Sequence, residues 1–262
     1  MISPSIVCSF NLFWLLLDDE LQNSYTMKKI VFLTGAGISA ESGITTFRDS
    51  GGLWEQYPVE AVASIEGYYR NPELVINFYN ERRRQLADVQ PNEAHRLVAK
   101  LEGQYDVCVV TQNVDNLHER GGSHNVIHLH GELMKATSTA NPNDPKCIIT
   151  LPSADSDINL GDKAADGSQL RPFIVWFGES VPMIEPAAKR VAEADIVIVI
   201  GTSLNVYPAA GLLGYAHHDA EVYLIDPHPN NVPAYSNIHV IAKKATEGMR
   251  ELYAQLTKDA TK

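Results

Sequence analysis

Residues 31–48 constrain the fold of this chain more than any other stretch. The stretch opens as an apolar strand, passes through Gly35 and Gly37, and continues over 39–42 with residues typical of a first helical turn. Glycines let a ligand lie against the main chain, and the N–H groups at a helix start favour a pyrophosphate. The pattern predicts the phosphate-binding corner of a dinucleotide fold. The third glycine of the motif is replaced by Ala40, so a plain strand-to-helix turn is the alternative.

Strand and helix patterns alternate along the rest of the chain. Apolar runs predict strands, and spaced apolar residues predict helices, for example over 73–86 and 92–104. The predicted later strands cover 106–111, 126–129, 172–179, 195–200, 221–225 and 238–242. Such alternation predicts an α/β fold with a doubly wound, parallel, Rossmann-like sheet. We expect a smaller lobe, inserted in two pieces, from about 51–91 and 132–171.

The composition excludes some classes of function. The 262 residues carry 21 basic and 32 acidic side chains, a net charge of −11, which disfavours a nucleic-acid partner. An acidic surface favours encounter with basic, lysine-bearing proteins. Three cysteines do not make a disulfide framework. We expect a cytoplasmic protein with no membrane partner.

The first 26 residues differ in character from the rest of the chain. Their apolar run over 6–17 is too short for a comfortable membrane span and lacks the features of a secretory signal. Met27 begins the first strand as many bacterial chains begin. We interpret 1–26 as a non-native or disordered extension and 27–262 as the catalytic domain. A genuine amphipathic N-terminal segment is the alternative.

Five blocks of sequence together point to a family. They are GAGISAESGITTFR with the following GLW, TQNVDNLH, HLHGE, FIVWFGE and GTSL. In type and order they resemble the opening signature and later motifs of the sirtuins, which are NAD-dependent protein lysine deacylases. The blocks cover residues 34–204, and weaker matches continue to Ala245.

The resemblance implies a set of residues that bind NAD as a consumed co-substrate. Phe47 would shield the reactive ribose face, and Arg48 would hold the loop and phosphates. Asn113 would position the nicotinamide ribose and a water, while Asp115 and the main chain of Val114 would bind the carboxamide. The full implied set is Gly35, Ala36, Gly37, Ile38, Ser39, Glu41, Phe47, Arg48, Trp54, Gln112, Asn113, Val114, Asp115, Gly201, Thr202, Ser203, Asp226, Pro227, His228 and Ala245.

The resemblance also implies the catalytic residues and the reaction. His130, before Gly131, matches the sirtuin base, and imidazole suits this role because its ordinary pKa lies near neutrality. Asn113 would be the second catalytic residue, whereas we interpret His128 as structural. The reaction would remove an acyl group from lysine and give nicotinamide and 2′-O-acyl-ADP-ribose.

Two segments are candidates for contact with an acyl-lysine protein substrate. Tyr79 and Arg82 lie three residues apart on one helix face and match the pair with which one sirtuin subgroup grips a succinyl or malonyl carboxylate. The main chain of Val175, Trp176, Phe177 and Gly178 would pair with the substrate backbone. We expect a desuccinylase and demalonylase that also accepts acetyl-lysine. The alternatives are a basic helix end facing solvent in a general deacetylase, and a mono-ADP-ribosyltransferase using the same NAD site. A non-catalytic NAD-binding protein is a third alternative, against which the intact His130 and Asn113 argue.

The small lobe departs from the family pattern. Most sirtuins carry two C-x-x-C pairs here, which bind a structural zinc. This chain has only Cys147 between 132 and 171, and no histidine between His130 and His217. We therefore predict no zinc and no other metal. The sequence predicts neither what stabilises the lobe instead nor an oligomeric state, although a monomer is compatible with it.

Overall fold

A parallel sheet forms the larger part of the molecule. The computed structural model describes residues 27–44, 57–202, 209–229 and 237–259. Within these ranges six strands pair in the order β3-β2-β1-β7-β8-β9, and every pair is parallel. Their bounds are β1 Lys29–Thr34, β2 Asp106–Thr111, β3 Val126–His128, β7 Ile196–Ile200, β8 Glu221–Ile225 and β9 Ile238–Ile241. The predicted doubly wound α/β fold is confirmed.

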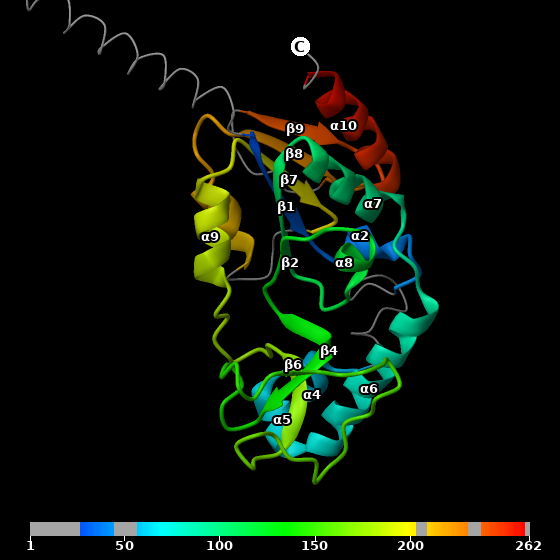
Figure 1. Cartoon of the computed structure of the whole chain (residues 1–262), viewed down its shortest axis with the longest axis vertical. Coiled ribbons are helices and arrows are strands. Elements are labelled where there is room, and N and C mark those ends of the chain that lie inside the picture. Colours follow the sequence, from blue (N-terminus) through cyan, green and yellow to red (C-terminus); the bar gives the residue numbers. More distant parts are fainter. Residues whose placement is uncertain (1–26, 45–56, 203–208, 230–236, 260–262) are drawn as a thin grey trace, which may run out of the picture.

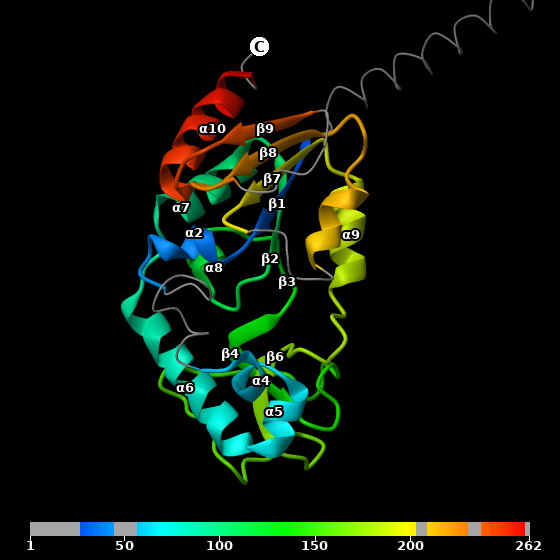
Figure 2. The same cartoon turned by 180° about the vertical axis from the view of Figure 1, so that it is seen from behind.

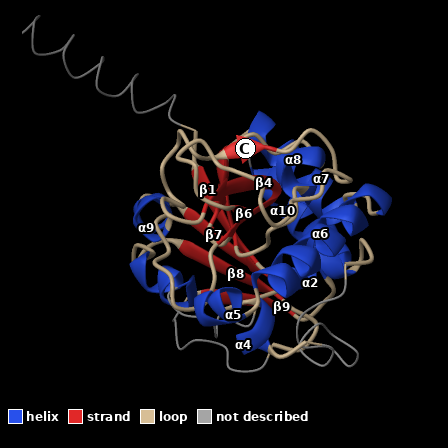
Figure 3. Cartoon of the chain, turned by 90° about the horizontal axis from the view of Figure 1, so that it is seen from below, coloured by secondary structure: helices blue, strands red, loops and turns tan. Residues whose placement is uncertain are grey.

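Helices cover both faces of this sheet, as Figures 1 and 3 show. They are α7 Glu93–Lys100 and α10 Ala245–Asp259 on one face, and α9 Ile184–Ala192 with the 3-10 helix η2 Ala209–Tyr215 on the other. Alternate side chains of a strand point to opposite faces. Ile30 and Phe32 of β1 therefore pack with α7 and α10, whereas Val31 and Leu33 pack with α9 and η2. Both faces of the strand are buried, which explains its uninterrupted apolar run.

A smaller group of elements lies at the carboxyl edge of this sheet, in the lower part of Figures 1 and 2. It contains α4 Val59–Val62, α5 Ile65–Arg70, α6 Pro72–Asp88 and an antiparallel sheet of β5 Ile149–Thr150, β4 Gly131–Ser138 and β6 Leu170–Ile174. Asn71 caps α6, because its side chain accepts from the Leu74 N–H, and Pro72 begins the helix. Helices and sheet share one core, which includes Tyr79 and Trp176.

A polar network stabilises the far end of this antiparallel sheet. The Ser138 hydroxyl contacts Asp166 Oδ2 at 2.5 Å and Ser168 Oγ at 2.8 Å, and it accepts from the Asn141 N–H at 2.8 Å. The Asn141 amide also donates to Asp166. Hydrogen bonds from Ser138, Asn141 and Ser168 hold the pKa of Asp166 well below its ordinary value. This network joins the end of β4 to the turn before β6.

The chain passes between the two sheets at His130. Strand β3 ends at His128 and β4 begins at Gly131, whose φ of +84° lies in the region that favours glycine. A Cβ at Gly131 would lie 2.1 Å from the Phe173 carbonyl oxygen. The sharp turn therefore needs glycine, and it holds His130 at the junction. None of the helices in the described ranges is long and apolar enough to cross a membrane.

Candidate functional site

The glycine-rich turn after β1 is packed against the end of β7. The Gly35 N–H donates to the Ile200 carbonyl at 3.1 Å, and the Gly37 N–H donates to the Gly201 carbonyl at 2.9 Å. A Cβ at Gly37 would lie 2.6 Å from the Gly201 Cα. The predicted corner is present, and it leads into α2 (Ala36–Ala40). Position 37 therefore needs glycine because the chain at the end of β7 approaches it closely, in addition to any contact with a ligand.

Three predicted residues form a buried hydrogen-bond chain beside this corner. The Asn113 amide donates to the Ser39 hydroxyl at 3.2 Å, and Ser39 donates to Asp115 Oδ2 at 3.0 Å. Asn113 also donates to the Gly35 carbonyl at 3.1 Å. Burial raises the pKa of Asp115, although bonds from Leu117 and Ser39 oppose it. The loop after β2 is thus tied to α2, which sets the side-chain orientations of Asn113 and Asp115.

Other predicted residues gather at the same edge, because the carboxyl ends of parallel strands meet there. The Gln112 amide donates to the Thr202 hydroxyl at 2.8 Å and joins the ends of β2 and β7. Asp226 follows β8 and accepts from the His228 N–H at 2.7 Å. Amide donors and carboxylate acceptors of this kind suit ribose hydroxyls and a carboxamide. The described donor set therefore fits a dinucleotide.

His130 is held in one tautomer by the main chain. Its Nδ1 lies 3.1 Å from the Gln112 carbonyl oxygen, which can only accept, so Nδ1 carries the proton. The other nitrogen, Nε2, then presents its lone pair. Burial lowers the pKa of His130 and outweighs the bond to Gln112. The ring is consequently neutral at neutral pH and able to accept a proton.

His128 contacts the same loop, although we interpreted it as structural from the sequence. Its Nδ1 lies 3.0 Å from the Asn113 carbonyl oxygen, and its Nε2 lies 2.7 Å from Glu119 Oε1 on α8 (Leu117–Arg120). The alternation of His128 and His130 was visible in the sequence, but their pairing with consecutive carbonyls depends on the register of β3 against β2.

Tyr79 and Arg82 lie in different surroundings on α6. Tyr79 is only 6% exposed, and burial raises the pKa of its hydroxyl. Arg82 is half-buried, lies 5.9 Å over the Phe78 ring and donates to Gln85. In the described part of the chain, no carboxylate lies within ion-pair distance of Arg82, whereas the neighbouring Arg84 pairs with Asp157 at 2.6 Å.

The segment 175–178 follows β6 rather than extending it, so the predicted strand over 172–179 ends at Ile174. The Val175 N–H donates to the His130 carbonyl at 2.9 Å, and the Phe177 N–H donates to Ala63 at 2.8 Å. Phe177 is half exposed, whereas Trp176 is buried with its ring stacked on Tyr68. The Trp176 side chain thus belongs to the core, and the segment is joined to His130 through the main chain.

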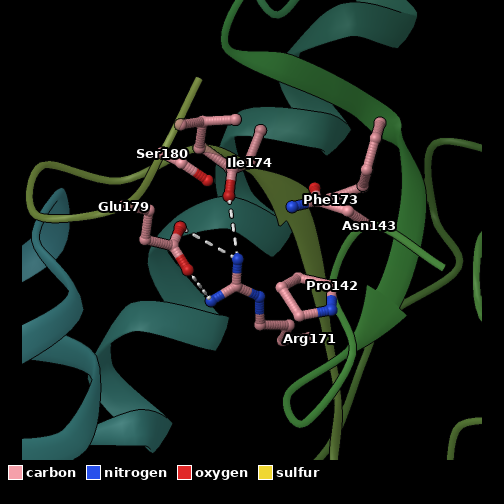
Figure 4. A pocket seen from close by; sticks show the side chains of 8 residues that line it. Pro142, Asn143, Arg171, Phe173, Ile174, Glu179 and Ser180 are labelled. Atoms are coloured by element: carbon pink, nitrogen blue, oxygen red, sulfur yellow. Dashed lines mark hydrogen bonds and ion pairs between the residues drawn. The ribbon is translucent and has the colours of Figure 1, made fainter. Parts of the chain in front are cut away.

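An ion pair between buried Arg171 and half-buried Glu179 lies next to this segment (Figure 4). Arg171 donates to both carboxylate oxygens of Glu179, at 2.8 and 3.0 Å, and its guanidinium lies 4.0 Å over the Trp176 ring. Glu179 also accepts from the Trp176 N–H. The pocket drawn there is lined by Pro142, Asn143, Arg171, Phe173, Ile174, Val175, Glu179 and Ser180. It lies beside β6 of the antiparallel sheet and is lined by none of the predicted NAD residues.

Some of the predicted NAD residues lie outside the described residues, and others are engaged in contacts within the protein. Phe47, Arg48, Trp54 and Ser203 lie outside the described residues. Ala245 is the first residue of α10 and is buried in the core, and Glu41 accepts from the Thr246 N–H in the same helical turn. Among the described residues, the side chains close enough to share a metal form two groups, His217 with His218 and Asp219, and Glu119 with His128 and Glu132. Neither group includes Cys147, which is buried and free.

Comparisons with known proteins agree with this geometry. The model of the Sir2 family matches residues 35–208. An NAD-dependent protein deacylase of Bacteroides thetaiotaomicron is 61% identical over 226 residues, covering 86% of this chain and 97% of that protein. One of Helicobacter pylori is 50% identical, covering 90% of this chain and all of that protein. A crystal structure of a Sir2 homologue complexed with NAD has a TM-score of 0.78 at 40% identity, covering 89% of this chain and 91% of the other.

Proposed function

The chain belongs to the Sir2 family, and on that basis we propose that it is an NAD-dependent protein deacylase that removes succinyl, malonyl and acetyl groups from lysine. The observation that carries the proposal is the arrangement at the sheet edge. A neutral His130 with an accepting Nε2 follows β3, and the buried chain of Asn113, Ser39 and Asp115 lies beside the glycine corner. A relative solved with ADP-ribose is 38% identical with a TM-score of 0.79, which supports a nucleotide at this edge.

The residues at this edge would each have a separate task. Gly35 to Ser39, Gln112, Asn113, Asp115, Gly201, Thr202 and Asp226 would hold NAD, which supplies an electrophilic ribose carbon with nicotinamide as leaving group. His130 would accept a proton from a ribose hydroxyl at Nε2, because Nδ1 is committed to Gln112. Asn113 would orient the reacting groups, since its amide is already fixed by Gly35 and Ser39. Segment 175–178 would bind the substrate main chain.

The acyl preference rests on Arg82. Of the three consecutive arginines on α6, Arg84 pairs with Asp157, and Arg83 is fully buried and bonded to Asn80. Arg82 is half-buried beside Phe78 without a described carboxylate partner. Burial lowers its pKa, but a guanidinium remains charged at neutral pH. A charged fork in partly apolar surroundings favours a carboxylate such as that of a succinyl group.

A panel of peptides tests this proposal. One peptide sequence would carry acetyl-, malonyl- or succinyl-lysine, and NAD-dependent release of free lysine would be followed for wild type, Arg82→Met and the matched control Arg84→Met. We expect Arg82→Met to lose about tenfold or more in kcat/KM on succinyl-lysine while retaining deacetylation, and Arg84→Met to behave as wild type. Equal acyl preference in all three proteins would favour a general deacetylase. ADP-ribose attached to protein without free lysine would favour mono-ADP-ribosyl transfer.

A further inference from the structure

His128 is a buried histidine with a hydrogen-bond acceptor at each ring nitrogen. Nδ1 faces the Asn113 carbonyl oxygen at 3.0 Å, and Nε2 faces the Glu119 carboxylate at 2.7 Å. A carbonyl and an ionised carboxylate cannot donate, so both nitrogens must carry protons for both bonds to form. The geometry therefore requires an imidazolium, with only 6% of the side chain exposed.

The charges around His128 favour this form. Burial alone would lower the pKa of His128, but the bond and charge of Glu119, then the charge of Glu132 and the Asn113 carbonyl, raise it above its ordinary value. Burial, the largest single effect, would raise the pKa of Glu119, but the bond and charge of His128, a backbone hydrogen bond and the charge of Lys135 together outweigh it, and the net pKa is lowered. The other titratable groups facing this pair are Asp115 and His118 on the adjoining loop and helix and Lys135, which pairs with Glu132.

The contact between His128 and Glu119 has the length of a hydrogen bond and is shorter than the distance between two ligands of one divalent ion. Glu119, His128 and Glu132 are close enough to share one, but a metal needs about 2.0–2.2 Å to each nitrogen or oxygen ligand. In a tetrahedral or octahedral site those ligands lie about 2.9–3.5 Å from each other. The Nε2 to Oε1 distance of 2.7 Å is that of a charge-assisted hydrogen bond. In this arrangement a proton bridges the two groups.

The two histidines on either side of Leu129 act on consecutive carbonyls. His130 holds the Gln112 carbonyl, and His128 holds the Asn113 carbonyl. The Asn113 side chain is fixed at its other end by Gly35 and Ser39. We propose that Glu119 and the His128 imidazolium are a positioning pair that holds Asn113 in place for the deacylation reaction, an inference that rests on the proposed function. When His128 loses its proton, the pair releases Asn113.

The consequence is a pH dependence with two opposite limbs. The reaction needs His130 without its extra proton and His128 with one, so activity should fall at low pH through His130 and at high pH through His128. Replacing Glu119 by glutamine removes the largest effect that raises the pKa of His128 and leaves the effect of burial. The alkaline limb should then move toward pH 6.5 or below.

The test is the pH profile of kcat/KM for NAD-dependent deacylation between pH 5.5 and 9. We would compare wild type, Glu119→Gln, Glu119→Asp and the control Glu102→Gln. Glu102 makes a similarly short contact, 2.6 Å, with exposed His124 at a distance from the site. At pH 8.5 we expect Glu119→Gln to lose about tenfold or more relative to wild type, and less than about threefold at pH 6. Glu119→Asp should restore part of the loss, and Glu102→Gln should follow wild type throughout.

A direct titration of His128 by NMR keeps the result independent of activity. We expect its pKa above 6.5 in wild type and a fall in Glu119→Gln, with melting temperatures showing that the variants are folded. If folded Glu119→Gln has the same alkaline limb as the wild type, the proposal of a positioning pair is overturned, whereas the proposed deacylase activity is not. A wild-type protein without NAD-dependent deacylation would instead refute the proposed function and, with it, any reaction for the pair to serve.

Discussion

Two buried histidines near the glycine-rich turn after β1 predict a loss of stability in acid. His95 on α7 and His118 on α8 lie with ring centroids 4.9 Å apart, and both are almost fully buried. His95 Nδ1 accepts from the Asn92 N–H at 3.3 Å in a capping box at the start of α7. Protonation of His95 would replace that acceptor by a donor, and burial lowers the pKa of His95 from 6.5 to about 4.

The sign and size of the effect come from this shift. The folded pKa lies below the unfolded one, so between about pH 6.5 and 4 the unfolded chain binds more protons and stability is lost as pH falls. Between pH 8 and pH 5 His95 alone should remove about 2 kcal/mol of the free energy of unfolding. Burial also lowers the pKa of His118 strongly, so His118 adds a loss of the same sign.

The variant His95→Gln isolates the contribution of His95. Glutamine is a standard partner in a capping box but does not titrate, so the cap is kept and the proton site removed. Urea unfolding would be measured at pH 8 and at pH 5. The decrease in the free energy of unfolding between these two pH values should be about 2 kcal/mol smaller in His95→Gln than in wild type. The control His218→Gln replaces an exposed histidine and should keep the wild-type loss. Equal losses in wild type and His95→Gln would refute the reasoning.

Four further outcomes are expected from the structure. Gly37→Ala should destabilise the fold by about 1–3 kcal/mol in urea unfolding, since its Cβ meets backbone, whereas Gly103→Ala, where a Cβ meets nothing within 4 Å, should change stability by less than about 1 kcal/mol. Asp166→Ala removes the acceptor of the Ser138 hydroxyl and should raise the rate of amide hydrogen exchange in the turn before β6. A metal chelator should leave the melting temperature of the wild type unchanged. A lower melting temperature with chelator would contradict the prediction that no metal holds these elements together. Glu179→Ala leaves buried Arg171 unpaired and should cost about 3–5 kcal/mol; an unchanged denaturation midpoint would contradict that role.

Much of the fold could be predicted because its signals are local. The apolar run of β1 continues without interruption because both faces of the strand are buried, and Pro72 and Asn71 mark the start of α6 directly. The strand expected over 172–179 was too long. The apolar pattern continues beyond Ile174. However, the Glu179 carboxylate accepts a hydrogen bond from the Trp176 N–H and Gly178 has a φ of +92°, so the chain turns there.

The parts that could not be predicted depend on contacts distant in sequence. Ser138 and Asp166 read as ordinary loop residues until the antiparallel sheet brings them within 2.5 Å. Glu119 and His128 are nine residues apart, and only the packing of α8 beside β3 makes them a pair. Likewise, the sequence indicated that Gly37 contacts a ligand. Its close contact with Gly201 could be recognised only once the structure placed the end of β7 beside it.

The most direct test of the central claim identifies the products. Wild-type protein would be incubated with a succinyl-lysine peptide with and without NAD, beside His130→Ala, and the mixture analysed by mass spectrometry. We predict that wild type with NAD forms free lysine peptide, nicotinamide and O-succinyl-ADP-ribose in equal amounts, and that omission of NAD or loss of His130 removes all three. Free lysine formed without NAD, or at an undiminished rate in His130→Ala, would contradict the account.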